Sequence, residues 1–205
     1  HSSTPLWRHS LPVSILVMLF SYNYLRKNLG VKISAKEMVR LMTEQAFEIE
    51  EYHEVAAPFT EVYVAQITKL EKHPSADRLR IATVTTKGRE YTVVCGAPNI
   101  EVGQRVPLAM IGATLPGDVT IAKTKIRDVV SHGMLCSGKE LGLSLDHTGI
   151  YILPQSAALG RDVALLFGYP DTIIDIKGLP NRPDAYTHVG IARELSALSG
   201  EIFTH

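Results

Sequence analysis

Apolar residues at helical spacing predict two short helices near the beginning of the chain. The first is Ser21–Leu29, and Gly30 is a suitable residue to end it. The second begins at Ser34, because Ser34 and Glu37 have the spacing of a capping box. A loosely alternating strand, residues 47–55, follows the second helix. The apolar stripes of the two helices consist of Tyr22, Leu25 and Leu29 in the first and Met38, Leu41, Met42 and Ala46 in the second.

From Phe59 the pattern changes to short runs of alternating residues, separated by turns rich in Gly, Pro and Asn. The expected strands are Val62–Leu70, Leu79–Thr85, Tyr91–Cys95, Val106–Ile111, Val119–Val130 and Ile150–Leu153. Five or six strands so close together favour a small β-barrel over an open sheet, because a barrel closes its own edges.

After Pro154 the pattern changes again, to a strand at Asp171–Ile176 and a helix from about Asp184 to Ser199. The side of this helix that we expect to be buried contains Val189, Ala192, Leu195 and Ser196. This segment is too short to form a core alone, so we expect it to pack on the helices and strand at the beginning of the chain. The predicted fold is therefore α+β, with a barrel inserted into a small discontinuous α/β domain. Residues 18–57 and 161–205 would be the two halves of that domain, residues 58–160 the barrel, and residues 1–17 an unassigned extension.

The most apolar run, Leu11–Phe20, has ten residues. A membrane-spanning helix needs about 20. A signal peptide is the more specific alternative, since Arg8 precedes the run. However, no cleavage site with small residues follows the run. We interpret its second half as a buried strand.

The charges balance, with 21 Lys and Arg against 21 Asp and Glu, so overall charge does not indicate a nucleic-acid partner. The barrel segment is slightly basic and the flanking segments are slightly acidic. Two cysteines are too few for a disulfide scaffold, and free thiols indicate a reducing compartment. The spacing of Cys95, Cys136, His73 and His132 along the chain does not resemble that of the ligands in a structural zinc site.

Residues 119–143 carry the candidate chemistry. If Val119–Val130 is one strand, Lys123, Lys125 and Arg127 share a face and stand roughly 6.6 Å apart. A row of like charges repels itself and suits a polyanion, although charged edge strands also protect against aggregation. Ser137 and Glu140 form another capping box, which predicts a short helix whose free N–H groups could meet a phosphate.

Four motifs in the barrel segment resemble the tRNA-binding OB-fold domain found in several synthetases and in free-standing tRNA-binding proteins. They are Lys72-His73-Pro74-Ser75-Ala76-Asp77-Arg78-Leu79, Val94-Cys95-Gly96-Ala97-Pro98-Asn99, Val102-Gly103-Gln104 and Ser131-x-Gly133-Met134-Leu135-Cys136-Ser137. The resemblance implies an OB-fold barrel that binds RNA.

The flanking segments resemble the N-terminal part of the bacterial phenylalanyl-tRNA synthetase β subunit. The matching motifs are Ser21-Tyr22-Asn23-Tyr24-Leu25, Glu48-Ile49-Glu50, Asn181-Arg182-Pro183-Asp184 and Gly190-Ile191-Ala192-Arg193-Glu194. This resemblance implies a cytoplasmic α2β2 ligase that uses ATP and Mg²⁺, with catalysis on the α subunit and editing further along β. The chain would then be an N-terminal fragment whose partners are tRNA, the α subunit and the remainder of β. The family usually has Trp where Tyr24 stands, and we expect this ring in the core.

The sequence has no GxxxxGK, HExxH or G-x-S-x-G motif, so nothing indicates catalysis in this segment. His73 and Asp77 are adjacent to a Pro turn and are expected to hold that turn rather than act as a base and its orienter. The predicted RNA contacts are Lys123, Lys125, Arg127, Ser131, Ser137, Lys139, Asn99 and Arg80, and no metal or cofactor is expected in this segment. An architectural segment that docks the synthetase and a free-standing tRNA-binding protein are the alternatives.

Overall fold

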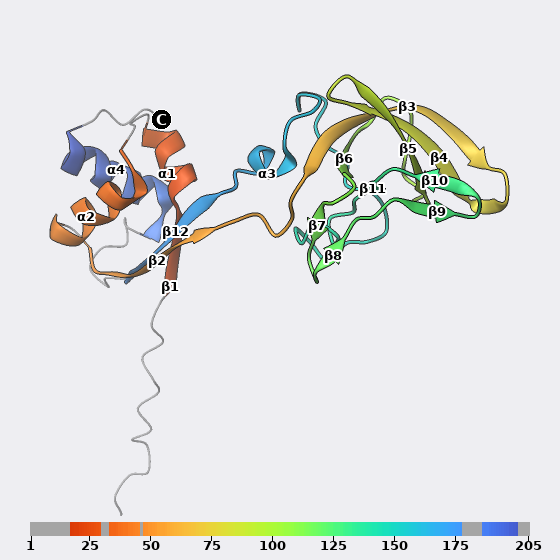
Figure 1. Ribbon diagram of the computed structural model, residues 1–205. Helices are drawn as coiled ribbons and strands as arrows, with labels where there is room; N and C mark the ends of the chain where they lie inside the picture. Colours follow the sequence, from red (N-terminus) through yellow and green to blue (C-terminus); the bar gives the residue numbers. More distant parts are fainter. Residues whose placement is uncertain (1–16, 30–32, 46, 178–185, 201–205) are drawn as a thin grey trace, which may run out of the picture. The chain divides into compact units, whose positions relative to one another are not determined.

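The computed structural model describes residues 17–29, 33–45, 47–177 and 186–200. These residues form two compact units (Figure 1). Unit 2 is residues 56–170, and unit 1 contains the described residues before 56 and after 170. The sequence predicts the boundaries between the barrel and the two halves of the α/β domain after residues 57 and 160. Residues 161–170 lie in unit 2 because Val163 of α3 (Val163–Leu166) packs with Val62 and Val64 in one hydrophobic cluster.

Unit 1 is built on a three-stranded antiparallel sheet whose central strand comes from late in the chain. The strands are β1 (Val17–Ser21), β12 (Asp171–Lys177) and β2 (Ile49–Val55), in the order β1-β12-β2. Phe20 is opposite Ile174, and Ile174 is opposite Tyr52, so these three side chains share a face. The second half of the most apolar run is therefore a strand, but an alternating one, because Leu19 is 56% exposed.

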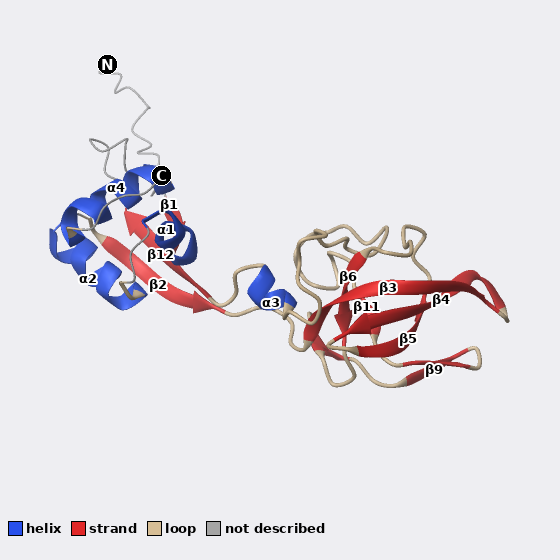
Figure 2. Ribbon diagram, turned by 90° about the horizontal axis from the view of Figure 1, so that it is seen from above, coloured by secondary structure: helices blue, strands red, loops and turns tan. Residues whose placement is uncertain are grey.

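Three helices, α1 (Tyr22–Leu29), α2 (Ala35–Gln45) and α4 (His188–Ser199), cover one face of this sheet (Figure 2). The helix predictions are confirmed, and so is the Ser34 cap, whose Oγ accepts the Glu37 N–H at 3.2 Å. Gly200 ends α4 with a positive φ of 73°. The shared core contains Met18, Phe20, Leu25, Met38, Met42, Phe47, Ile174, Ile176, Ile191, Ala192 and Leu195.

Two details of unit 1 differ from the sequence analysis. Ile191, and not Val189, is fully buried on α4. Tyr24 is 49% exposed and contacts the ring of His188 edge-on, so it lies outside the core. Gly30, Ala46 and Asn181–Asp184 fall outside the described residues.

Unit 2 contains a five-stranded antiparallel sheet in the order β11-β6-β3-β4-β5. Its strands are β3 (Val62–His73), β4 (Ala76–Thr86), β5 (Arg89–Cys95), β6 (Arg105–Ala109) and β11 (Met134–Leu135). Two small hairpins accompany it, β7 (Thr114–Leu115) with β8 (Val119–Thr120) and β9 (Thr124–Ile126) with β10 (Val129–Ser131). None of the helices in the described part of the chain is long and apolar enough to cross a membrane.

The two edge strands of this sheet, β5 and β11, do not pair as a ladder in the described residues. The segment leading into β11 links to β5 instead. The His132 N–H donates to the Thr92 carbonyl at 2.9 Å, and the Val94 N–H donates to Ser131 Oγ at 3.1 Å. These two hydrogen bonds therefore link the two edges of the sheet at one position. Beyond that position the described residues form no ladder between β5 and β11.

Three predicted elements in unit 2 were wrong. The expected strand Val119–Val130 is divided among β8, β9 and β10. The expected strand Ile150–Leu153 is reduced to one bridge between Leu153 and Arg105. No helix follows Ser137, where the chain makes a turn and Gly142 has a positive φ of 67°.

The end of β1 and the beginnings of α1 and α4 meet at His188 in unit 1. The ring of His188 lies edge-on to Phe20 at 5.0 Å and to Tyr24 at 4.7 Å, measured between centroids. Its Nε2 accepts the Ser21 N–H at 3.4 Å, and burial lowers the pKa of His188 below the ordinary 6.5. The fold therefore favours the neutral ring.

Unit 1 should lose stability as the pH falls through 6.5, because the unfolded chain then binds a proton more readily than the folded chain. The loss should stop below the lowered pKa of folded His188. Thermal unfolding at about pH 7.5 and about pH 5.5, followed by circular dichroism at 222 nm, measures this, since three of the four helices that the structure describes belong to unit 1. A His188→Gln variant keeps an acceptor that does not titrate and should respond less to pH; an equal response would contradict this assignment.

Candidate nucleic-acid interface

The β9–β10 hairpin brings a cation to the tip of a tight turn. Ile126 pairs with Val129, so Arg127 and Asp128 are the two turn residues, with positive φ values of 42° and 73°. This backbone is that of a type I′ turn, which matches the twist of the two strands. Lys123, Lys125 and Arg127 therefore do not share one strand face, and the predicted row of cations was wrong in its geometry.

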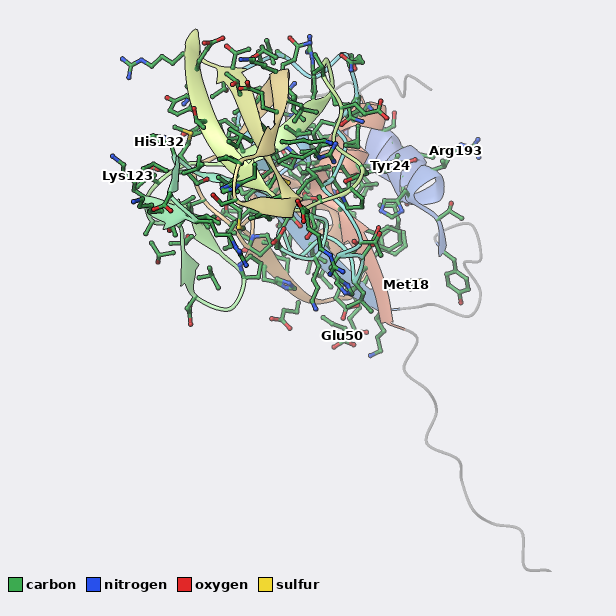
Figure 3. All side chains as sticks on the ribbon, turned by 90° about the vertical axis from the view of Figure 1, so that its right-hand side faces the viewer. Met18, Tyr24, Glu50, Lys123, His132 and Arg193 are labelled. Atoms are coloured by element: carbon green, nitrogen blue, oxygen red, sulfur yellow. The ribbon has the colours of Figure 1, made fainter. Side chains whose placement is uncertain are left out.

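All three cations are nevertheless exposed on or beside this hairpin. Lys123 precedes β9 and points away from the sheet of unit 2 (Figure 3). Within the described residues it has no ion-pair partner. Lys125 Nζ lies 2.9 Å from Asp128 Oδ1, an exposed pair that neutralises part of its charge.

His73 connects this hairpin to the turn between β3 and β4. Its side chain is 5% exposed, and its Nδ1 accepts the Ser75 N–H at 3.1 Å. Nε2 lies 3.1 Å from the Ile126 carbonyl, which can only accept, so Nε2 carries the proton. His73 thus holds two turns together and is not placed as a base.

A depression of about 510 Å³ lies where the two turns meet, lined by Pro74–Leu79 and Arg127. Arg127 Nη1 is 3.4 Å from the Ser75 carbonyl, and Arg78 is exposed on the same lining. The sequence analysis missed Arg78, because its separation from Arg127 in the chain hides their proximity. We call Arg78, Lys123, Lys125 and Arg127 the cationic tip.

Arg80 and Asn99, two predicted RNA contacts, have internal partners instead. The Arg80 guanidinium donates to the carbonyls of Ile100 and Ala97 at 2.9 and 2.6 Å. Asn99 accepts from and donates to the backbone of Ile150, both at 2.9 Å. These side chains hold the loop that follows β5, while Asn99 stays exposed, and their RNA contact stays a prediction.

Ser131 and Ser137, two further predicted RNA contacts, are both buried. Ser131 Oγ accepts the Val94 N–H and donates to the Gly133 carbonyl at 2.9 Å. Ser137 and Glu140 complete the predicted capping box, with distances of 2.6 and 3.3 Å, around a turn rather than a helix. Neither hydroxyl is presented to a ligand.

Lys139 is exposed beside a larger depression of about 700 Å³ between β5 and β11. His147 and Thr148, which the sequence analysis did not single out, also line this depression. The loop that carries them is ordered by Asp146, whose Oδ1 accepts the Thr148 N–H at 2.9 Å and whose carbonyl accepts the Lys139 N–H at 2.9 Å.

Both cysteines are buried free thiols, and burial raises the pKa of each, that of Cys136 to about 12. A thiol with a raised pKa is a poor nucleophile and a poor metal ligand at neutral pH. In the ranges that the structure describes, no group of three or more His, Cys, Asp or Glu side chains could hold a metal ion.

Comparison with known proteins finds similarity to the barrel segment alone and to most of the chain. The model of the family described as "Putative tRNA binding domain" matches residues 62–162. The phenylalanine–tRNA ligase beta subunit of Dechloromonas aromatica is 43% identical over 184 residues, which are 89% of this chain and 23% of that protein. The same subunit of Syntrophus aciditrophicus is 42% identical over 90% of this chain, again 23% of that protein.

Among solved structures, a MetRS-related protein from Pyrococcus horikoshii aligns with 48% of this chain and 84% of its own, at 21% identity and a TM-score of 0.37. A score at this level does not establish a common fold. The chain spans about a quarter of the length of the relatives it matches in sequence. The chain matches the model of the tRNA-binding family at residues 62–162 and, over about nine tenths of its length, is similar to a segment of phenylalanine–tRNA ligase β subunits.

Proposed function

We propose that this chain is a non-catalytic, N-terminal segment of a phenylalanine–tRNA ligase β subunit and that unit 2 binds tRNA. The observation that carries the proposal is the family match at residues 62–162 within a chain 42–43% identical to those subunits. The whole ligase would join phenylalanine to tRNA with ATP and Mg²⁺, in the cytoplasm and as an α2β2 assembly. This segment would contribute RNA contact and contacts with the α subunit and the remainder of β.

The proposed architecture is an OB-like barrel inserted into a discontinuous α/β domain. The five-stranded sheet of unit 2 and the links from His132 and Ser131 to β5 support a barrel. The central position of β12 between β1 and β2 supports a discontinuous domain, because the two chain segments share one sheet.

The proposed RNA contact is the cationic tip, with Lys139 as a separate contact. Exposed Lys and Arg side chains on two connected turns can approach phosphates without first breaking buried hydrogen bonds. Tyr63, Tyr91 and Tyr151 are the tyrosines of residues 62–162, and none belongs to the tip. Phosphate contacts should therefore outweigh base stacking at the tip, and the affinity should depend strongly on salt.

A docking role without RNA is the second candidate, favoured by large apolar side chains on the surface. Leu145 is 90% exposed on the loop after the Ser137 turn. On the sheet face of unit 1 opposite Phe20 and Ile174, Leu19 is 56% exposed. Such side chains are typical of protein interfaces. A free-standing tRNA-binding protein is disfavoured, because the sequence match extends through unit 1.

Titration of the chain into labelled tRNA, followed by fluorescence anisotropy, separates the two candidates. We expect a dissociation constant in the micromolar range at about 50 mM salt, weakening by roughly tenfold or more by about 200 mM. An unlabelled acidic polypeptide as competitor controls for unspecific charge. The absence of a complex at about 100 µM protein in low salt would contradict RNA binding and leave the docking role.

A further inference from the structure

Hydrogen bonds from two side chains attach the tip of the β9–β10 hairpin to the rest of unit 2. Neither β9 nor β10 belongs to the five-stranded sheet, and the links to β5 lie at the base of the hairpin. For residues 123–130, the structure describes two hydrogen bonds to other segments, one from His73 to the Ile126 carbonyl and one from Arg127 to the Ser75 carbonyl. The Arg127 bond is exposed and 3.4 Å long, so it is the weaker of the two. His73 is therefore the main polar attachment of the tip.

The turn between β3 and β4 prepares His73 for this contact. His73 ends β3 and pairs with Ala76, so Pro74 and Ser75 are the two turn residues. Because Nδ1 accepts the Ser75 N–H, the turn itself orients the ring and leaves Nε2 to donate to the Ile126 carbonyl. The side chain is buried, so water competes little for either bond.

The two turns that His73 joins bring like charges together. Arg78 follows one turn, Arg127 lies in the other, and both line the depression of about 510 Å³. Asp77 lines it as well, so the lining keeps one more positive charge than negative charges. Repulsion between the two guanidinium groups opposes the contact between the turns. Because Nδ1 accepts and Nε2 donates, the ring of His73 is uncharged and joins the turns without adding a third cation.

We infer that His73 is the positioning residue of the cationic tip. Its ring fixes the hairpin against the β3–β4 turn, so that Arg78 and Arg127 reach the same phosphate of a bound RNA. Two cations that are fixed in advance bind a phosphate more tightly than two that must first be brought together, because less order is lost on binding. The inference rests on the proposed function and deepens it, because it names the residue on which the arrangement of the tip depends.

Two substitutions of His73 separate its two hydrogen bonds. Asparagine places its oxygen near the position of Nδ1 and can keep the bond to Ser75, but it is too short to reach Ile126. Glutamine places its amide nitrogen near the position of Nε2 and can keep the bond to Ile126. Both variants lose the buried ring, so each is the matched control of the other. In the anisotropy titration with labelled tRNA, His73→Asn should weaken binding by about threefold or more, and His73→Gln by less than about twofold.

A double-mutant cycle distinguishes positioning from a general loss of structure. In an Arg127→Ala background the hairpin lacks the cation that His73 positions, so His73→Asn should weaken tRNA binding by less than about 1.5-fold. In a Lys139→Ala background the tip is intact, and His73→Asn should keep its full effect of about threefold or more. A general loss of structure would weaken binding equally in both backgrounds.

Hydrogen exchange followed by mass spectrometry tests the attachment without RNA. The peptide that contains residues 126–129 should exchange about threefold or more faster in His73→Asn than in His73→Gln, while β4 exchanges equally in both. Equal exchange of this peptide, equal tRNA binding by the two variants, or equal effects of His73→Asn in the two backgrounds would overturn the inference and leave the proposed function standing. If the wild-type chain does not bind tRNA, the inference and the proposed function fail together.

Discussion

Replacing Gly133 with alanine should destabilise unit 2 by about 3 kcal/mol or more. Gly133 has a φ of 148°, which side-chain-bearing residues rarely adopt, and a Cβ there would lie 2.6 Å from the Ala109 carbonyl oxygen. That oxygen belongs to β6, next to the pairing of Ala109 with Met134. The backbone would have to separate where β11 joins the sheet.

Gly103→Ala is the matched control. Gly103 also has a positive φ, 92°, but its Cβ would meet nothing within 4 Å, so the substitution should cost only about 1 kcal/mol of backbone strain. Calorimetry of both variants gives the comparison. Circular dichroism at 222 nm should be nearly unaffected in its transition, because α3 is the only helix of unit 2 in the described part of the chain. Equal effects of the two substitutions would contradict the close approach at Gly133.

Replacing Lys123, Lys125 and Arg127 together with alanine should weaken tRNA binding by about 10- to 100-fold at low salt. Each phosphate contact contributes about 0.7 to 0.9 to the slope of log affinity against log salt, so the slope should fall by about 2 to 3. The loss should be smaller if Lys125 contributes little, since it pairs with Asp128 at 2.9 Å. Asp128→Asn in the wild-type background should then strengthen binding.

The helices and most strands follow directly from local spacing. Leu25, Met38, Met42 and Leu195 are buried as their helical periods predict. The shared sheet of unit 1 was also predictable, because the strand Asp171–Lys177 must bury one face. This strand, β12, does so between β1 and β2.

The hairpin at Arg127 and Asp128 could not be recognised from the sequence. Type I′ turns are usually signalled by Asn-Gly or Asp-Gly, and this turn has neither, so the alternating pattern continued through it. The helix predicted after Ser137 and Glu140 is also an error that the sequence could not reveal. Their reciprocal hydrogen bonds form, but the chain turns at Gly142 before a helix can propagate.

Burial separates the predicted site residues that face solvent from those that do not. Ser131 and Ser137 have the polar chemistry that an RNA contact needs, yet both are buried and accept hydrogen bonds from backbone N–H groups. Only three-dimensional proximity distinguishes a polar side chain that supports a loop from one that faces a ligand. The same proximity adds Arg78 to the tip, through the turn that His73 holds.

The salt dependence of tRNA binding by two triple variants tests the central claim most directly. One variant removes Lys123, Lys125 and Arg127, and the other removes three exposed cations of unit 1, Arg26, Lys27 and Lys36, so both lose the same net charge. We predict that the slope of log affinity against log salt falls by about 2 to 3 in the first variant and by less than about 0.5 in the second. Equal slopes in the two variants would show that tRNA responds to overall charge, and the cationic tip would then not be its binding site.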